Sequence, residues 1–159
     1  TDLQAIRTIA RRDPGTGNYI VNGTKTWISN ALHASVFALL VKTDPNASPR
    51  YRGMSLLIAD KREGFATGRK FDKLGYKSID SAELIFDNFA VPADQLIGSV
   101  EGQGLIQATG GLELGRINVA ARGVGLAEGS LRLATEYAQQ RHTMGKPIAE
   151  HQAIQLKLG

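Results

Sequence analysis

Short apolar and β-branched runs, separated by polar turn residues, make up the first part of the chain. The runs lie at residues 19–21, 24–28, 36–41, 54–59 and 82–86. Several short strands at such spacing are typical of a sandwich or barrel. No helical pattern alternates with these runs, so a doubly wound parallel sheet is disfavoured.

Asn22-Gly23 stands between the first two of these runs, residues 19–21 and 24–28. Both residues tolerate positive φ, which suits the two-residue loop of a hairpin. We therefore predict a β-hairpin with its turn at Asn22-Gly23.

The hydrophobic period changes after Pro92 and Gly98, because apolar residues then recur at steps of three and four. This stripe consists of Ile117, Ala120, Val124, Ala127, Leu131, Ala134 and Ala138. It predicts one long helix with a single packing face. A break at Gly145-Lys146-Pro147 precedes a second helix, predicted from about Ile148 onward. Two helices do not enclose a bundle core, so we expect further helices from additional sequence or from other subunits.

These patterns predict an α+β protein. An antiparallel, sandwich-like or barrel-like β domain is expected over residues 1–98, and the first helices of an α-helical bundle domain over residues 99–159. The sequence starts at Thr1 without an initiator methionine and stops at Gly159 inside an apolar, helix-like segment. We therefore expect a piece of a longer protein.

Composition narrows the class of protein. A hydrophobic fraction of 42% with 21% charged residues is ordinary for a folded domain and argues against disorder. The absence of cysteine excludes disulfides, thiolate metal sites and a cysteine nucleophile. No apolar run approaches the roughly 18 residues of a membrane span, and no signal peptide is evident. We therefore expect a soluble, intracellular protein.

The net charge of +4 is unevenly distributed, because basic residues gather between Arg50 and Lys77. Such a stretch is either a solvated rim of loops and strand ends or a surface that binds phosphate groups. The sequence leaves both interpretations open.

Four segments match one protein family in their order and spacing. They run from Thr1 to Thr8, from Tyr19 to Asn30 (YIVNG-x-K-x-WISN), from Lys73 to Pro92, and from Arg116 to Gln152. One such segment would be a weak signal, whereas four in sequence are strong. Over almost its whole length the chain resembles the acyl-CoA dehydrogenases.

The resemblance implies an FAD site. Trp27 alone would be interpreted as a core residue, but in this family the equivalent tryptophan packs beside the flavin ring. In the family, backbone N–H groups face the polar edge of the ring, and Ile28 occupies that position here. A hydroxyl side chain bonds the N5 atom of the ring, and Ser29 occupies that position. An amphipathic aromatic side chain and a short hydroxyl suit these tasks. Thr1 aligns with the last residue of a preceding flavin loop.

Arg141 and Thr143 match an Arg-x-Thr that, in the family, contacts the FAD pyrophosphate and adenosine of a neighbouring subunit, with Gln152 nearby. A guanidinium suits a diphosphate because it carries permanent charge and several fixed donors. Met144 stands where the family usually has phenylalanine.

The resemblance also implies an acyl-CoA contact at Glu113 and Arg116. These residues are three apart on one helix face, so an intrahelical ion pair is the alternative. The reaction requires a glutamate that removes the α-proton of the thioester. A minority of the family carries this base immediately before the helix arginine, where this chain has Gly115. We therefore expect no catalytic residue in the chain and a base beyond Gly159.

The activity implied is α,β-dehydrogenation of an acyl-CoA in fatty acid metabolism, by a homotetramer that passes electrons to an electron-transfer flavoprotein. Acyl-CoA oxidases and flavin-dependent monooxygenases of the same fold are the first alternative. A DNA-binding relative is the second, and the basic stretch is its only support. Because that stretch lacks interleaved aromatic residues, nucleic-acid binding is disfavoured.

Overall fold

The computed structural model describes residues 2–159. These residues divide after Gly110 into two compact units, each of which is described by itself.

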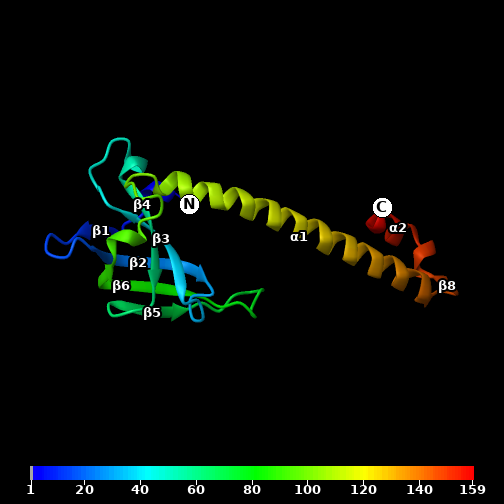
Figure 1. The fold of residues 1–159 in the computed structure, drawn as a ribbon. Helices are drawn as coiled ribbons and strands as arrows, with labels where there is room; N and C mark the ends of the chain where they lie inside the picture. The colour runs from blue at the N-terminus through cyan, green and yellow to red at the C-terminus, as the bar shows by residue number, and fades with distance from the viewer. Residues whose placement is uncertain (1) are drawn as a thin grey trace. The chain divides into compact units, whose positions relative to one another are not determined.

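A six-stranded sheet forms the first unit (Figure 1). Its strands are β1 (Ile9–Arg12), β2 (Tyr19–Ser29), β3 (Val36–Lys42), β4 (Met54–Asp60), β5 (Phe65–Lys70) and β6 (Ser81–Val91). Their order across the sheet is β4-β3-β1-β2-β6-β5. All neighbouring strands are antiparallel except β1 and β3. The predicted α+β class with a β domain first is confirmed, and the sheet is mixed through this one parallel pair.

The sheet is continuous through β1 for only a short distance. β1 meets β3 at a single position, Ile9 opposite Lys42, and pairs with β2 only as far as Asn22. The second half of β2 therefore lies beyond β1, with strand pairing to β6 but not to β3 among the described residues. Across this opening the Lys25 ammonium donates a hydrogen bond to the Leu40 carbonyl oxygen at 2.5 Å.

Buried aromatic and aliphatic side chains fill the core of the first unit. Four phenylalanines make a network of stacked and edge-on ring contacts. They are Phe37, Phe65, Phe86 and Phe89. Tyr19, Val21 and Leu57 are fully buried beside them. Buried and more exposed residues alternate along β3, because successive side chains of a strand point to opposite faces of the sheet.

Asn22-Gly23 lies within β2, so the predicted hairpin is wrong. The register with β6 shifts between Val21 and Gly23, which identifies a β-bulge. Gly23 has φ 137°, and a Cβ there would lie 2.8 Å from the Thr8 Cα. The Asn22 side chain accepts a hydrogen bond from the backbone N–H of Asn88 on β6 at 2.9 Å. The backbone freedom of the Asn-Gly pair therefore serves a bulge and a close strand approach.

The segment before the long helix is fixed to the sheet by part-buried polar contacts. The Tyr19 hydroxyl donates to Glu101 Oε1 at 2.6 Å. The Ser55 hydroxyl accepts from the Gly102 N–H at 3.1 Å. A Cβ at Gly104 would lie 2.5 Å from the Ser55 carbonyl carbon. The helix thus starts in direct contact with the backbone of β4.

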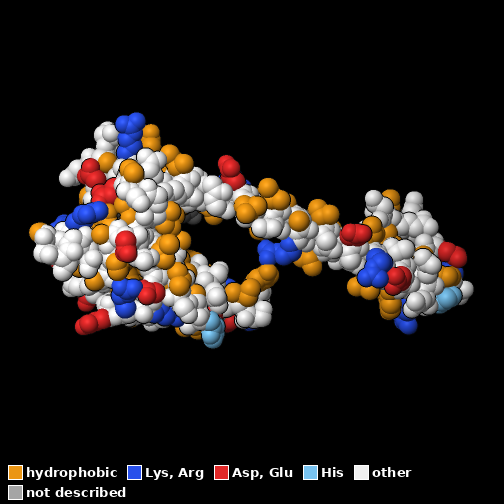
Figure 2. Space-filling view, viewed as in Figure 1, with side chains coloured by type: hydrophobic (Ala, Val, Ile, Leu, Met, Phe, Trp, Pro, Cys, Tyr) orange, Lys and Arg blue, Asp and Glu red, His pale blue; other side chains and the backbone are white. Residues whose placement is uncertain are grey.

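The long predicted helix is observed as α1 (Gly104–Gln140), which carries the whole apolar stripe. Figure 2 shows hydrophobic side chains along it. Ile117 is 67% exposed and Val124 is 68% exposed, so the described residues leave most of the stripe uncovered, although Ala138 at its end is buried. The expected neighbouring helices stay a prediction.

After α1 the chain forms a tight ribbon, β7 (His142–Thr143) and β8 (Lys146–Pro147), whose turn is Met144-Gly145. Both turn residues have positive φ, 51° and 80°. The second helix, α2 (Gln152–Leu158), starts four residues later than predicted. The reason is a separate 3-10 turn, η4 (Ile148–Glu150), which ends where His151 adopts an extended backbone.

Three further 3-10 turns are η1 (Leu3–Ala5), η2 (Arg50–Gly53) and η3 (Ala93–Gln95). The domain boundary predicted at residue 98 lies between β6 and α1 and stays a prediction. None of the helices in residues 2–159 has the length and apolar character needed to cross a membrane.

Lys25 gives the first unit a pH dependence. Burial lowers the pKa of its ammonium from 10.5 to about 8. The unfolded chain therefore binds more protons between these values, and folding stability rises as pH increases from about 8 to 10.5. We expect the wild type to gain up to about 3 kcal/mol over Lys25→Met across this window. Denaturant unfolding of both proteins measures the difference, and a difference that is independent of pH would contradict the assignment.

Candidate functional site

The end of β2 presents an aromatic ring to solvent. The register with β6 shifts again between Lys25 and Ile28, and Trp27 in this bulge has φ 58°. Its indole is 60% exposed and stacks on Phe71, with ring centroids 4.1 Å apart and planes at 16°. The bulge therefore turns Trp27 away from the core, and its position as a core residue is excluded.

Ser29 ends β2 two residues later. Its hydroxyl is exposed and makes no hydrogen bond to another residue in the described range 2–159. Ser29 lines a hollow of about 430 Å³ at the opening between β2 and β3, where Lys25 and Ile28 also lie. The rest of its wall is mainly apolar side chains of β3. Trp27, Ile28 and Ser29 thus lie at one strand end, which carries an exposed indole and, among residues 2–159, a hydroxyl without a hydrogen-bond partner.

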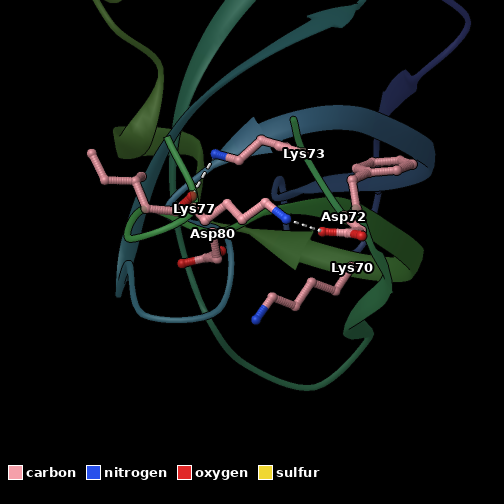
Figure 3. A pocket seen from close by; sticks show the side chains of 7 residues that line it. Lys70, Asp72, Lys73, Lys77 and Asp80 are labelled. Atoms are coloured by element: carbon pink, nitrogen blue, oxygen red, sulfur yellow. Dashed lines mark hydrogen bonds and ion pairs between the residues drawn. The ribbon is translucent and has the colours of Figure 1, made fainter. Parts of the chain in front are cut away.

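A second hollow, of about 330 Å³, has three lysine side chains in its wall (Figure 3). Phe71 and Ile79 line it together with Lys70, Asp72, Lys73, Lys77 and Asp80. The Lys77 ammonium is 3.3 Å from the Asp72 carboxylate, and Lys73 donates to the Ile79 carbonyl oxygen at 2.5 Å. Part of the basic stretch noted in the sequence therefore lines this hollow, and both interpretations of that stretch stay open.

In the second unit, the ribbon after α1 brings together Arg141, Thr143 and the start of α2. The Arg141 carbonyl oxygen accepts from the Ile148 N–H at 2.8 Å, which closes the ribbon. The Thr143 hydroxyl is 3.1 Å from His151 Nε2, and Gln152 follows as the first residue of α2. The Arg141 guanidinium is exposed and has no carboxylate partner in residues 2–159.

Glu113 and Arg116 are exposed on α1. No ion pair joins them, and neither is paired with another residue in the described part of the chain, so the intrahelical alternative is not observed. Arg116 lines a largely apolar hollow of about 560 Å³ with Leu112, Gly115 and Val119. The space next to Gly115 is open, since a Cβ there would meet nothing within 4 Å.

Thr1 lies outside the described residues, so its predicted flavin contact is not addressed. The roles predicted for the other site residues also stay predictions. Sequence reasoning missed Phe71 and Asp80, because their partners lie some fifty positions away in the chain. Residues 2–159 hold no cluster of three His, Asp or Glu side chains that would bind a metal ion.

Two family models match the chain. Residues 1–89 match "Acyl-CoA dehydrogenase, middle domain", and residues 102–159 match "Acyl-CoA dehydrogenase, C-terminal domain".

Curated relatives carry related names. The "Acyl-CoA dehydrogenase" of Bacillus subtilis is 39% identical over 99% of the chain and 41% of its own length. The "Acryloyl-CoA reductase (NADH)" of Anaerotignum propionicum is 39% identical over 98% of the chain and 39% of its length. The chain therefore spans well under half the length of these relatives.

Solved structures share the fold. An acyl-CoA dehydrogenase from Geobacillus kaustophilus is 41% identical, with a TM-score of 0.92. The match covers 99% of the present chain and 41% of the Geobacillus chain. An acyl-CoA dehydrogenase complexed with FAD from Bacillus anthracis is 33% identical, with a TM-score of 0.85. The match covers 96% of the present chain and 25% of that one. A prolyl acyl carrier protein oxidase, AnaB, is 28% identical, with a TM-score of 0.91. The match covers 99% of the present chain and 40% of the oxidase chain.

Proposed function

Because the chain belongs to the acyl-CoA dehydrogenase family, we propose that it forms part of an FAD-dependent enzyme that α,β-dehydrogenates an acyl-CoA thioester. The observation that carries this proposal is the end of β2. An indole 60% exposed lies there, two residues from a hydroxyl that has no partner among the described residues. Aromatic side chains combined with a few polar groups are typical of the lining of small-molecule sites.

The residues present fit the cofactor. The open face of Trp27 provides apolar area and the Ser29 hydroxyl can donate or accept a hydrogen bond, which suits a ring with a polar edge. Arg141 offers a permanent charge and a planar set of donors that residues 2–159 do not neutralise. Trp27, Ile28 and Ser29 would hold the ring end of FAD, and Arg141, Thr143 and Gln152 the pyrophosphate and adenosine end from a neighbouring subunit.

Bound FAD would supply an acceptor for the hydride that leaves the β-carbon of the substrate. The chain's own residues bind, orient and exclude water. Trp27 shields the reacting centre, Ser29 provides a hydrogen bond at the polar edge, and Glu113 and Arg116 contact the acyl-CoA. Removal of the α-proton needs a carboxylate within hydrogen-bond reach. We assign that base to sequence outside this chain, so the chain as printed would be inactive.

Further properties of the whole protein follow from the same proposal. It acts in fatty acid metabolism as a homotetramer and passes electrons to an electron-transfer flavoprotein. Its compartment is the bacterial cytoplasm or the mitochondrial matrix, of which we prefer the cytoplasm. The test is anaerobic incubation of the full-length protein with a panel of acyl-CoAs, followed by mass spectrometry. We expect at least one acyl-CoA to lose two hydrogens. Recovery of every acyl-CoA unchanged would contradict the proposed reaction.

An oxidase is the second candidate, because the AnaB oxidase has a closely similar fold. The reduced flavin of an oxidase reacts quickly with oxygen, whereas that of a dehydrogenase reacts slowly. Oxygen consumption during turnover therefore separates the two. Rapid consumption matched to product would select the oxidase.

Gly115 provides a test of the helix register. Gly115→Glu should leave flavin content unchanged, because the side chain would enter open space and the family tolerates glutamate there. Replacing a helix glycine also favours the helix by up to about 1 kcal/mol. The ratio of flavin to protein after gel filtration measures the outcome. Flavin-free Gly115→Glu would show that α1 is rotated relative to our assignment.

A further inference from the structure

Asp80 is a buried carboxylate in an otherwise exposed loop. It is 7% exposed, whereas the residues just before it are open to solvent. Among the described residues, its Oδ1 atom accepts no hydrogen bond, and the His33 ring nitrogen lies 4.0 Å away. Burying an incompletely bonded carboxylate is unfavourable. Its presence here therefore points to a task that an apolar residue would not perform.

The bonds that Asp80 does make hold the turn that follows β2. Its Oδ2 atom accepts from the Leu32 N–H at 2.9 Å, and its backbone carbonyl oxygen accepts from the Asn30 N–H at 2.9 Å. Asn30 in turn accepts from the Ala34 N–H at 2.7 Å. One residue thus fixes both the first and the third residue of the turn, which begins directly after Ser29.

The segment that this turn completes is strained. Trp27 and Asn30, which flank Ile28 and Ser29, both have φ near 60°. Non-glycine residues in this region each cost on the order of 1–3 kcal/mol, and they persist where surrounding contacts fix them. Ser29 therefore lies between two residues with left-handed backbone, and Asp80 bonds the second of them directly through its backbone carbonyl and the turn after it through its carboxylate.

The start of β6, directly after Asp80, also supports the Trp27–Phe71 ring pair. Ser81 lies opposite Ser29 in the β2–β6 pairing, and its carbonyl oxygen accepts from the Phe71 N–H at 2.8 Å. Phe71 carries the ring on which Trp27 stacks. Figure 3 shows Asp80 in the hollow with the lysine side chains. Three ammonium groups around that hollow disfavour a bound cation as the reason for the carboxylate.

We propose that Asp80 is a positioning residue of the flavin site, whose hydrogen bonds to the turn 30–34 set the place of the Ser29 hydroxyl next to Trp27. This inference rests on the proposed function. The Asp80 carboxylate acts on the site through Leu32, and its backbone carbonyl acts through Asn30.

The test compares Asp80→Ala, Asp80→Asn and Asp80→Glu in the full-length protein. Alanine removes the acceptor for the Leu32 N–H, asparagine keeps a neutral oxygen there, and glutamate keeps the charge but displaces it by one methylene. The matched control is Asp72→Ala, which removes a carboxylate 93% exposed from the same hollow without touching the turn.

Two readouts are needed. Hydrogen exchange of residues 29–34 reports the turn without reference to any cofactor. The reduction potential of bound flavin and its rate of reduction by acyl-CoA report the site. In Asp80→Ala we expect faster exchange, a shifted potential and a reduction rate lower by about tenfold to a hundredfold, because small misplacements of reacting groups have effects of this size. In Asp80→Asn and in Asp72→Ala, the exchange, the potential and the reduction rate should all stay near the wild-type values.

Unchanged exchange and an unchanged potential in Asp80→Ala would overturn the inference. If that variant does not fold, the other two decide. Asp80→Asn near wild type with Asp80→Glu impaired supports positioning, and the reverse order overturns it. A wild-type protein without flavin would instead refute the proposed function, while the exchange data would still report on the turn.

Discussion

Replacing Arg141 with alanine will strip most of the flavin from the purified protein. The guanidinium has no carboxylate partner in the described chain, and it matches the family's pyrophosphate contact. Removing one member of a hydrogen-bonded charge pair costs about 2–5 kcal/mol. That range corresponds to an affinity for FAD weaker by roughly 30-fold or more. The ratio of flavin to protein after gel filtration measures the loss.

Two further variants sharpen this experiment. Arg141→Lys keeps the charge but not the planar donors, so its flavin content should be intermediate. Arg132→Ala is the matched control on the same unit, because Arg132 already pairs with Glu136 at 3.8 Å on α1. If Arg141→Ala retains as much flavin as Arg132→Ala, the pyrophosphate assignment is wrong.

Gly104→Ala will destabilise the protein, although alanine is the better helix former. The added Cβ would lie 2.5–2.8 Å from three backbone atoms of Ser55, and backbone atoms do not rotate out of the way. Overpacking of this kind costs about 3 kcal/mol or more. Helix propensity alone would instead favour alanine by about 1 kcal/mol. Denaturant unfolding therefore distinguishes the two effects, because overpacking lowers the free energy of unfolding and helix propensity raises it.

Gly15→Ala is the control for this experiment. Gly15 lies in the same unit, and a Cβ there would meet only Asp13 Oδ2, at an ordinary 3.6 Å. We expect its free energy of unfolding to be unchanged or slightly higher. Equal stability of Gly104→Ala and Gly15→Ala would show that α1 does not start against β4 as described.

Local patterns predicted the elements well, because they depend on neighbours in sequence. The three-to-four periodicity from Ile117 to Ala138 lies on α1, and the short apolar runs lie on strands. Asn22-Gly23 misled the prediction, since positive φ serves a bulge as well as a hairpin turn. Which of the two forms depends on Thr8 and Asn88, which are distant in sequence.

The candidate site was predictable only as far as a resemblance to a family reached. Trp27 and Ser29 were found through their motif, while their geometry depends on a bulge and on contacts from residues distant in sequence. Phe71 reaches Trp27 across forty-four positions of the chain, and Asp80 reaches Leu32 across forty-eight. No local pattern reports such pairs, so Asp80 became evident only once its burial and its hydrogen bonds were known.

The most direct test of this account is a crystal structure of the full-length protein loaded with FAD, in which the distance from flavin N5 to the Ser29 hydroxyl oxygen is measured. We predict about 3 Å, a hydrogen-bond distance, with the isoalloxazine ring against the Trp27 indole. A ring bound elsewhere, with Trp27 and Ser29 both facing solvent, would contradict it.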